Sequence, residues 1–219
     1  MTKPLILINC KTYPEAAGKK ALKIAQQIAQ VKNTKYRIVI APSLLTLQEI
    51  AGKVKIPIFA QHADPFSFGA HTGSIPIQEL KSLGITGTLL NHSERKIPLT
   101  ILQKIVHLCR KEKIITVVCA SSLAEVQKVA SLHPDYLAYE PPELIGGNVS
   151  VTKAKPEIIA TAVRLVRSLS PSTKVLCGAG VQSAADVQKA LELGTSGVLI
   201  AHAVVKAKNP KRMVERMLE

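Results

Sequence analysis

The sequence predicts an α/β protein, a (β/α)8 barrel that forms one domain over residues 1–219. Short runs rich in Val, Ile and Leu recur along the chain without polar alternation, which is typical of parallel strands buried on both faces. The segments between these runs have the apolar spacing of amphipathic helices. Eight βα units in 219 residues leave about 27 residues per unit, near the lower size limit of this architecture. The predicted strands are residues 4–10, 36–41, 56–61, 85–91, 114–120, 136–140, 174–178 and 197–201.

Helix signals follow these strands in chain order. After the second strand, Ser43 is an expected N-cap, and Ser121 has the same place after the fifth strand. Pro156 fits the first turn of the helix after the sixth strand. A doubly wound open sheet is the competing architecture. Such sheets usually have about five or six strands, which would leave two of the apolar runs unexplained. Apolar residues at helical spacing cover 21–29, 102–109, 124–130 and 158–166.

The composition is that of a folded protein. Apolar residues make up 47% of the chain, which excludes intrinsic disorder. No apolar run approaches the roughly 18 residues of a membrane span, and Lys11 interrupts the N-terminal run before a signal-peptide core could form. We therefore expect a cytoplasmic protein. The four cysteines are far apart and form no C-x-x-C pair, so we expect reduced, buried thiols.

The charge is strongly basic, with 29 Lys and Arg against 15 Asp and Glu, a net charge of +14. Such a charge would attract nucleic acid, an anionic membrane or small phosphorylated metabolites, and charge alone does not choose among them. With no Trp, three Phe and four Tyr, the chain lacks the aromatic residues of a base-stacking platform. The basic clusters fall on expected helix faces, where a solvated surface is their ordinary role.

Polar residues collect at the carboxyl ends of the predicted strands, where barrel enzymes carry their active sites. The first strand ends with Asn9 and Lys11, whose shared parity directs both side chains to the same side of the barrel mouth. Lys11 could hold an anion there, or it could simply mark the exit of the strand into solvent.

His92 and Glu140 are the two candidate acid–base residues. His92 precedes Ser93-Glu94-Arg95-Lys96, which predicts the start of a short helix, and a helix N-terminus favours a neutral imidazole that can donate to a carbonyl. Glu140 ends an apolar strand before two prolines, where a partly desolvated carboxylate is a stronger general base. The alternatives are an ordinary loop histidine and a salt-bridged carboxylate at the rim.

Three loops have the composition of ligand-binding segments. Residues 141–153 begin with prolines and carry glycines at an apolar tip, which suits a lid that excludes water. Gly178-Ala179-Gly180 and Ala201-His202-Ala203 follow the last two strands, where barrel enzymes commonly bind phosphate through backbone N–H groups. A lone G-x-G motif is weak evidence for a phosphate site. Its position across the barrel mouth from Lys11 strengthens that evidence.

Five motifs in this order resemble the triosephosphate isomerase family: Asn9-x-Lys11, His92-Ser93-Glu94, Tyr139-Glu140-Pro141, Gly146 and Gly178-Ala179-Gly180. The segment Glu-Pro-Pro-Glu-Leu-Ile-Gly at 140–146 is similar to the compact archaeal branch. The resemblance covers essentially the whole chain, and the motifs are specific in combination. It implies a TIM barrel that interconverts dihydroxyacetone phosphate and glyceraldehyde 3-phosphate through an enediolate.

The resemblance also implies a role for each site residue. Glu140 would abstract and return the proton, and neutral His92 would polarise the carbonyl. Lys11 and Asn9 would supply positive potential and orientation, with Glu94 as a partner of Lys11. No metal and no organic cofactor is implied. The residues that would bind the substrate phosphate are Ile145, Gly146, Gly178, Gly180, Ala201 and His202.

Two departures from the family pattern affect the ligand site. His202 stands where the family usually has a small residue, which concerns substrate affinity. Gly146-Gly147-Asn148 replaces the Gly-Thr-Gly of many archaeal relatives, which concerns the dynamics of the lid. Neither departure concerns the type of reaction.

The loop at 64–73, after the third strand, carries Phe66 and Phe68, and exposed aromatic side chains at such a place need a cover. In the family this loop enters the neighbouring subunit, and Thr72 matches its tip threonine. The resemblance therefore implies a homodimer or a tetramer. Packing of the loop on itself is the alternative.

Two other functions stay open on the sequence alone. Another phosphosugar-binding barrel would keep the phosphate loops but would not need His92 to face Glu140. A basic nucleic-acid-binding protein would bind arbitrary DNA with a strong salt dependence. We expect a small phosphorylated triose as the partner, and neither a specific nucleic acid nor a membrane.

Overall fold

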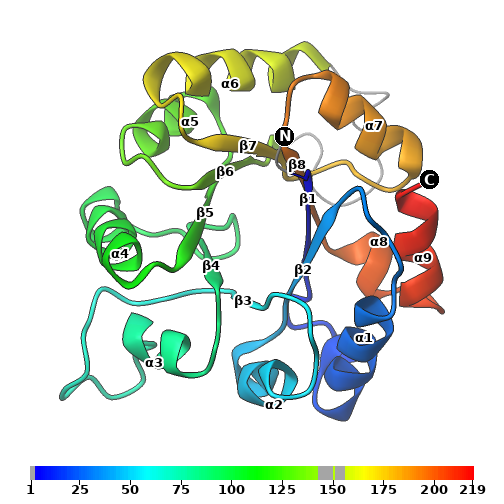
Figure 1. The fold of residues 1–219 in the computed structure, drawn as a ribbon. Coiled ribbons are helices and arrows are strands. Elements are labelled where there is room, and N and C mark those ends of the chain that lie inside the picture. Colours follow the sequence, from blue (N-terminus) through cyan, green and yellow to red (C-terminus); the bar gives the residue numbers. More distant parts are fainter. Residues whose placement is uncertain (1–2, 143–149, 151–155) are drawn as a thin grey trace.

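The computed structural model describes residues 3–142, Ser150 and residues 156–219. Eight parallel strands form one nearly closed barrel with helices around the outside (Figure 1). The predicted fold class is confirmed, and each predicted strand is present. The strands are β1 (Leu5–Asn9), β2 (Arg37–Ala41), β3 (Phe59–Ala60), β4 (Gly87–Leu90), β5 (Ile115–Ala120), β6 (Tyr136–Tyr139), β7 (Lys174–Cys177) and β8 (Gly197–Ile200).

The barrel closes weakly between its second and third strands. The hydrogen-bonded order is β2-β1-β8-β7-β6-β5-β4-β3, and β2 meets the β3 segment only through a bridge between Ile40 and Ile58. The prediction of a strand over 56–61 was too long, because only two residues are in strand conformation. Pro57 has no N–H to donate, so it contributes to the pairing only through its carbonyl, which accepts the Ile40 N–H at 3.3 Å.

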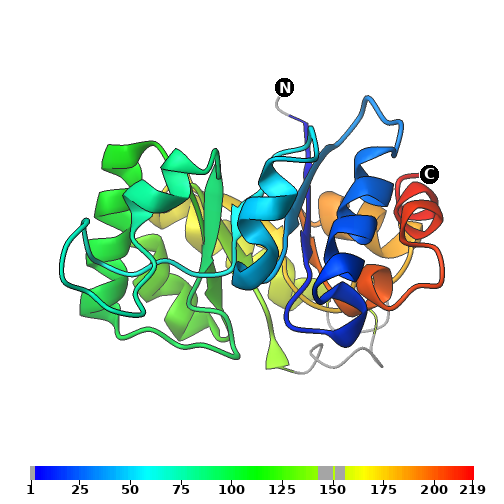
Figure 2. The same ribbon diagram turned by 90° about the horizontal axis from the view of Figure 1, so that it is seen from below.

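Helices cover the outer face of the barrel in sequence order, and α1 and α9 pack side by side (Figures 1 and 2). Pro156 is the first residue of its helix, as predicted. No helix among the described residues is long and apolar enough to cross a membrane. The helices are η1 (Pro14–Ala16), α1 (Lys19–Ala29), η2 (Leu44–Thr46), α2 (Leu47–Ala51), α3 (Ile77–Ser82), α4 (Leu99–Glu112), α5 (Leu123–Ala130), α6 (Pro156–Leu169), α7 (Ala184–Glu192), α8 (His202–Val205) and α9 (Pro210–Met217).

Of the two predicted serine caps, Ser43 has the predicted position and Ser121 is displaced by one residue. The N-cap of α5 is Ser122, whose hydroxyl accepts the Glu125 N–H, and not Ser121. Ser121 instead donates its backbone N–H and its hydroxyl to the Glu125 carboxylate, at 2.7 and 2.9 Å. Ser43 is the N-cap residue of η2, as predicted, although its side chain makes no capping bond and its backbone carbonyl accepts the N–H of Thr46.

Side chains of the strands alternate between the barrel interior and the helix layer. One buried cluster fills the interior and includes Leu5 and Leu7, whereas Ile6 and Ile8 belong to the cluster beneath the helices. Asn9 therefore points inward at the carboxyl end of β1, as its parity predicts. The four cysteines are buried and free, as expected.

Candidate active site

The carboxyl ends of several strands surround one cavity of about 470 Å³. In Figure 2 these strand ends point downward, with the arrowhead of β6 at the bottom of the barrel. Every predicted site residue that the structure describes lines this cavity, whereas Ile145 and Gly146, at the tip of the expected lid, lie outside the described residues. The predicted residues that it brings together are Asn9, Lys11, His92, Glu140, Gly178, Gly180, Ala201 and His202.

A chain of contacts joins the three candidate catalytic residues. The Lys11 ammonium lies 2.7 Å from Glu94 Oε1, so the expected pairing of these residues is present. The backbone N–H of Glu94 donates to His92 Nδ1 at 3.2 Å. His92 Nε2 lies 3.3 Å from Glu140 Oε1. An ammonium, an imidazole and a carboxylate from β1, β4 and β6 therefore face one small volume.

Lys11 is placed by its backbone and not by strand parity, because β1 ends at Asn9. Lys11 has a φ of +47°, in the left-handed region that non-glycine residues rarely adopt. Its N–H donates to Asn9 Oδ1 at 2.9 Å, and its carbonyl accepts from Gln61 Nε2 at 3.0 Å. The amide of Gln61 also donates to the Ala41 carbonyl of β2. These bonds hold the strained turn that directs Lys11 to the cavity.

The helix predicted at His92 is absent. Residues 92–95 form a turn in which the Arg95 N–H donates to the His92 carbonyl, and α4 begins only at Leu99. Pro98 limits any helix that begins at His92, because it disfavours helical conformation at Ile97 and leaves room for only about one turn before it. The helix N-terminus that was expected to keep the imidazole neutral is therefore not the cause.

A single backbone bond sets the tautomer of His92 instead. Nδ1 accepts the Glu94 N–H, so its lone pair is used and the ring proton is on Nε2. The Glu94 carboxylate is farther from Nδ1, at 3.6 Å, is 60% exposed and pairs with Lys11. The backbone N–H of Glu94, and not its carboxylate, therefore sets the tautomer of His92. Neutral His92 directs an N–H donor to the cavity beside Glu140.

Glu140 is buried, with 3% of its surface exposed, directly after β6. Its N–H donates to the Ala120 carbonyl, which continues the ladder between β5 and β6. A Cβ on Gly178 would lie 2.6 Å from Glu140 Cγ, so the glycine leaves the space that the carboxylate side chain occupies. The Cys119 thiol packs against Glu140, and burial first, then the charge of Glu140, raise the pKa of that thiol well above its usual range.

The part of the cavity wall formed after β7 and β8 carries a cation that sequence reasoning missed. The Lys206 ammonium lies 4.7 Å from the centre of the Tyr13 ring, and both residues line the cavity. Lys206 is four residues after His202, the first residue of α8, so one helical turn separates the two. The four-residue spacing between His202 and Lys206 was the sequence signal that could have identified this cation. Gly180, on the same wall, has a φ of +72°, which explains why this position requires glycine.

Comparisons with known proteins identify the family. A family model described as triosephosphate isomerase matches residues 4–217. The chain belongs to the triosephosphate isomerase family. A triosephosphate isomerase of Methanothermus fervidus is 42% identical over 219 residues, covering 100% of this chain and 99% of the relative. Those of Methanocaldococcus jannaschii and Methanobrevibacter smithii are 41% and 40% identical, over 98% and 96% of this chain and 99% and 96% of the relatives.

In this member of the triosephosphate isomerase family, a second cavity of about 490 Å³ adjoins the first and shares Asn9, Lys11 and His92 with it. It is also lined by Leu44 and Leu45, which are 44% and 98% exposed. Such exposed leucines beside a polar site indicate a surface that another protein surface could cover.

The loop at 64–73 packs partly on itself. Phe66 stacks on His71 with ring centres 4.3 Å apart and an interplanar angle of 17°. Phe68 lacks such a cover and is 65% exposed. Self-packing therefore accounts for one of the two aromatic residues, and the other is available to a partner.

Proposed function

We propose that the chain interconverts dihydroxyacetone phosphate and glyceraldehyde 3-phosphate, with Glu140 as the base. The observation that carries the proposal is the placement of His92 Nε2 at 3.3 Å from Glu140 Oε1, with Lys11 linked to His92 through Glu94. Family membership favours this reaction over other phosphosugar barrels, which would not need an imidazole and a carboxylate in contact.

The reaction follows from the chemistry of these groups. Glu140 removes a proton from the carbon next to the carbonyl, and the electron pair of the broken C–H bond forms the double bond of an enediolate. The Nε2–H of His92 donates to the oxygen that gains negative charge and then moves a proton between the two oxygens. Glu140 returns its proton to the neighbouring carbon. The Lys11 ammonium offsets the charge of substrate and intermediate, and Asn9 holds the turn that places it.

The substrate phosphate would be bound in the same cavity, at the carboxyl ends of β7 and β8. The backbone of Gly180 and Ala201 would offer N–H groups there and Lys206 an ammonium, whereas the Gly178 N–H already donates to the Tyr139 carbonyl at 2.8 Å, so Gly178 would serve by leaving space beside the site. His202 is the first residue of α8 and lines the cavity, and we propose that its backbone contacts the phosphate. The proposed contribution of Ile145 and Gly146 falls on residues outside those described.

We further propose that the protein is a homo-oligomer that acts in the cytoplasm. The loop at 64–73 of one subunit would enter the cavity of about 490 Å³ of its neighbour, where Leu44 and Leu45 are exposed. Phe68 would then lose its contact with water. The proposal rests on the match between an uncovered aromatic side chain and an apolar-lined cavity.

A coupled assay with glyceraldehyde 3-phosphate tests the proposed roles. Glu140→Asp moves the base by about 1 Å and should lower kcat on the order of 10²-fold. His92→Ala should lower kcat by roughly 10²- to 10⁴-fold, the usual range for a positioned acid–base group. Glu79→Asp, an exposed carboxylate on α3, is the matched control and should keep full activity. Wild-type turnover in Glu140→Asp would refute the assignment of the base.

A further inference from the structure

The loop at 91–97 carries both His92 and Glu94, and it begins at a strained residue. Asn91 follows β4 with a φ of +56°, in the left-handed region, and only 4% of its surface is exposed. Asn tolerates this region better than most residues with a Cβ, but the conformation persists only where neighbours enforce it. The bonds of its side chain show what enforces it here.

The amide of Asn91 ties both ends of the loop to neighbouring elements. Nδ2 donates to the Cys119 carbonyl of β5 at 2.9 Å and to Glu125 Oε1 of α5 at 2.8 Å. Oδ1 accepts the N–H of Ile97, six residues further along the chain, at 2.9 Å. One side chain therefore closes the loop on itself and fastens it to β5 and α5.

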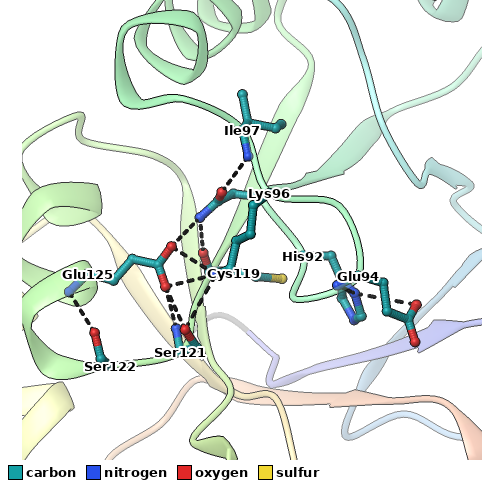
Figure 3. A network of polar contacts seen from close by, with 9 residues as sticks. His92, Glu94, Lys96, Ile97, Cys119, Ser121, Ser122 and Glu125 are labelled. Carbon is teal, nitrogen blue, oxygen red and sulfur yellow. Dashed lines mark hydrogen bonds and ion pairs between the residues drawn. The ribbon is translucent and has the colours of Figure 1, made fainter.

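The Glu125 carboxylate is itself held in place by several donors (Figure 3). Lys96 Nζ lies 2.8 Å from each of its oxygens, and the backbone N–H and hydroxyl of Ser121 donate to Oε2. Charge-assisted bonds of this kind are shorter and stronger than neutral ones. Asn91 is thus anchored to a fixed carboxylate and not to a mobile surface side chain.

The same bonds reach both candidate catalytic residues. On one side, Asn91 is the chain neighbour of His92, whose Nε2 faces Glu140. On the other side, Asn91 holds the backbone of Cys119, whose thiol packs against Glu140. The contacts form a closed ring across β4, β5 and β6, so a change at Asn91 would alter the imidazole–carboxylate distance.

We propose that Asn91 is a positioning residue that orients His92 toward Glu140, with Glu125 and Lys96 as its anchor. The proposal rests on the roles proposed for His92 and Glu140. Asn91 touches neither substrate nor reacting atoms, and it acts through the direction in which the loop presents the imidazole.

The test is Asn91→Gly, which keeps the left-handed backbone accessible and removes the three amide bonds. We expect kcat to fall roughly 10- to 100-fold, because a misplacement near 1 Å has effects of this order. KM should stay within about threefold, since the phosphate loops after β7 and β8 are untouched. In spectra of ¹⁵N-histidine-labelled protein, the fixed Nε2–H tautomer of His92 should give way to an averaged signal in the variant.

Lys113→Gly is the matched control, because Lys113 is a non-glycine residue with a φ of +60° at the far end of α4. It should keep wild-type kcat and an unchanged His92 signal. A kcat of Asn91→Gly within twofold of wild type, or an unchanged His92 tautomer signal, would overturn the proposal.

Glu125→Gln keeps the proposal testable if Asn91→Gly does not fold. The glutamine amide cannot accept from Lys96, Ser121 and Asn91 together, so kcat should fall roughly 3- to 10-fold at unchanged KM. An unchanged kcat would again overturn the proposal. His92→Ala, assayed beside these variants, separates the two ideas: if it retains activity, the proposed role of His92 is wrong, and if it alone loses activity, only the positioning role of Asn91 is wrong.

Discussion

Gly178 shows how closely single residues fit around the proposed base. A methyl group at this position would lie 2.6 Å from Glu140 Cγ and 3.0 Å from the Tyr139 carbonyl oxygen. The carbonyl belongs to a hydrogen-bonded strand and cannot move far, so the glutamate side chain has to yield. The identity of residue 178 therefore controls where the carboxylate lies.

Gly178→Ala should lower kcat on the order of 10²-fold, because the displaced carboxylate no longer reaches the carbon-bound proton. The coupled isomerase assay measures this loss, and circular dichroism checks that the variant is folded. Gly52→Ala, at the C-cap of α2, adds a methyl group with no neighbour closer than 3.7 Å and should keep wild-type kcat. Full activity in Gly178→Ala would show that the contact is not limiting.

At the residue scale, the sequence predicted the side chains that end strands but not those that support them. Glu140 and His92 were found because polar residues after apolar strands are unusual. Gln61 and Asn91 were missed, since their roles depend on amide bonds to carbonyls of other strands. These carbonyl partners are distant in sequence, so no local sequence pattern indicates them.

At the scale of elements, Glu125 in the first turn of α5 connects the N-cap of this helix to the loop that carries His92. Burial by itself raises the pKa of Glu125, but hydrogen bonds from Lys96, Ser121 and Asn91 together outweigh it and hold that pKa below its usual value. A carboxyl group with a lowered folded-state pKa stabilises the fold above its unfolded pKa of about 4.3. That contribution is lost as the pH falls through the lower folded-state pKa.

Glu125→Gln should therefore reduce the acid sensitivity of the fold. Urea unfolding at pH 7 should show the variant to be less stable, because glutamine cannot replace the charge-assisted bonds. As the pH falls from about 5 to 3, the difference from wild type should shrink, since protonation removes the same bonds from wild type. A difference that stays constant over this range would contradict the lowered pKa.

Element boundaries were predicted less well than element types. The segment at 92–96 is a turn and not a helix, because Pro98 delays α4 until Leu99. The serine at position 121 was preferred as the cap of α5, whereas Ser122 has the extended conformation of an N-cap. The first error came from giving Pro98 too little weight. The second arose because two adjacent serines compete for the cap, a choice that backbone geometry decides and composition does not.

At the scale of the whole molecule, continuous apolar strands sufficed to predict the barrel. A sheet covered on both faces needs such strands, and eight of them at near-even spacing leave little choice of architecture. The weak closure between β2 and β3 was not predicted, although Pro57, just before β3, is a sequence sign that strand pairing is limited there. The proposed assembly of subunits rests mainly on Phe68, which is 65% exposed in the single chain.

Phe68→Ser should shift the protein from oligomer to monomer, because the proposed contact depends on an aromatic side chain that is 65% exposed in the single chain. Size-exclusion chromatography with light scattering over a range of concentrations measures the change. Leu169→Ser, at the end of α6, removes another exposed apolar side chain and should leave the mass unchanged. A monomeric wild type, or a Phe68→Ser variant of wild-type mass, would refute the loop-mediated interface.

The convergence of Glu140 and His92 on one three-carbon phosphoester is tested most directly by isomerisation in D₂O, followed by proton NMR. The wild type should place solvent deuterium on the carbon next to the carbonyl of the product, since a carboxyl group that holds the substrate proton can exchange it with solvent. Glu140→Gln has no carboxylate, so we expect both turnover and deuterium incorporation to disappear while the fold is retained. Deuterium incorporation by Glu140→Gln at the wild-type rate would contradict the assignment of Glu140 as the base.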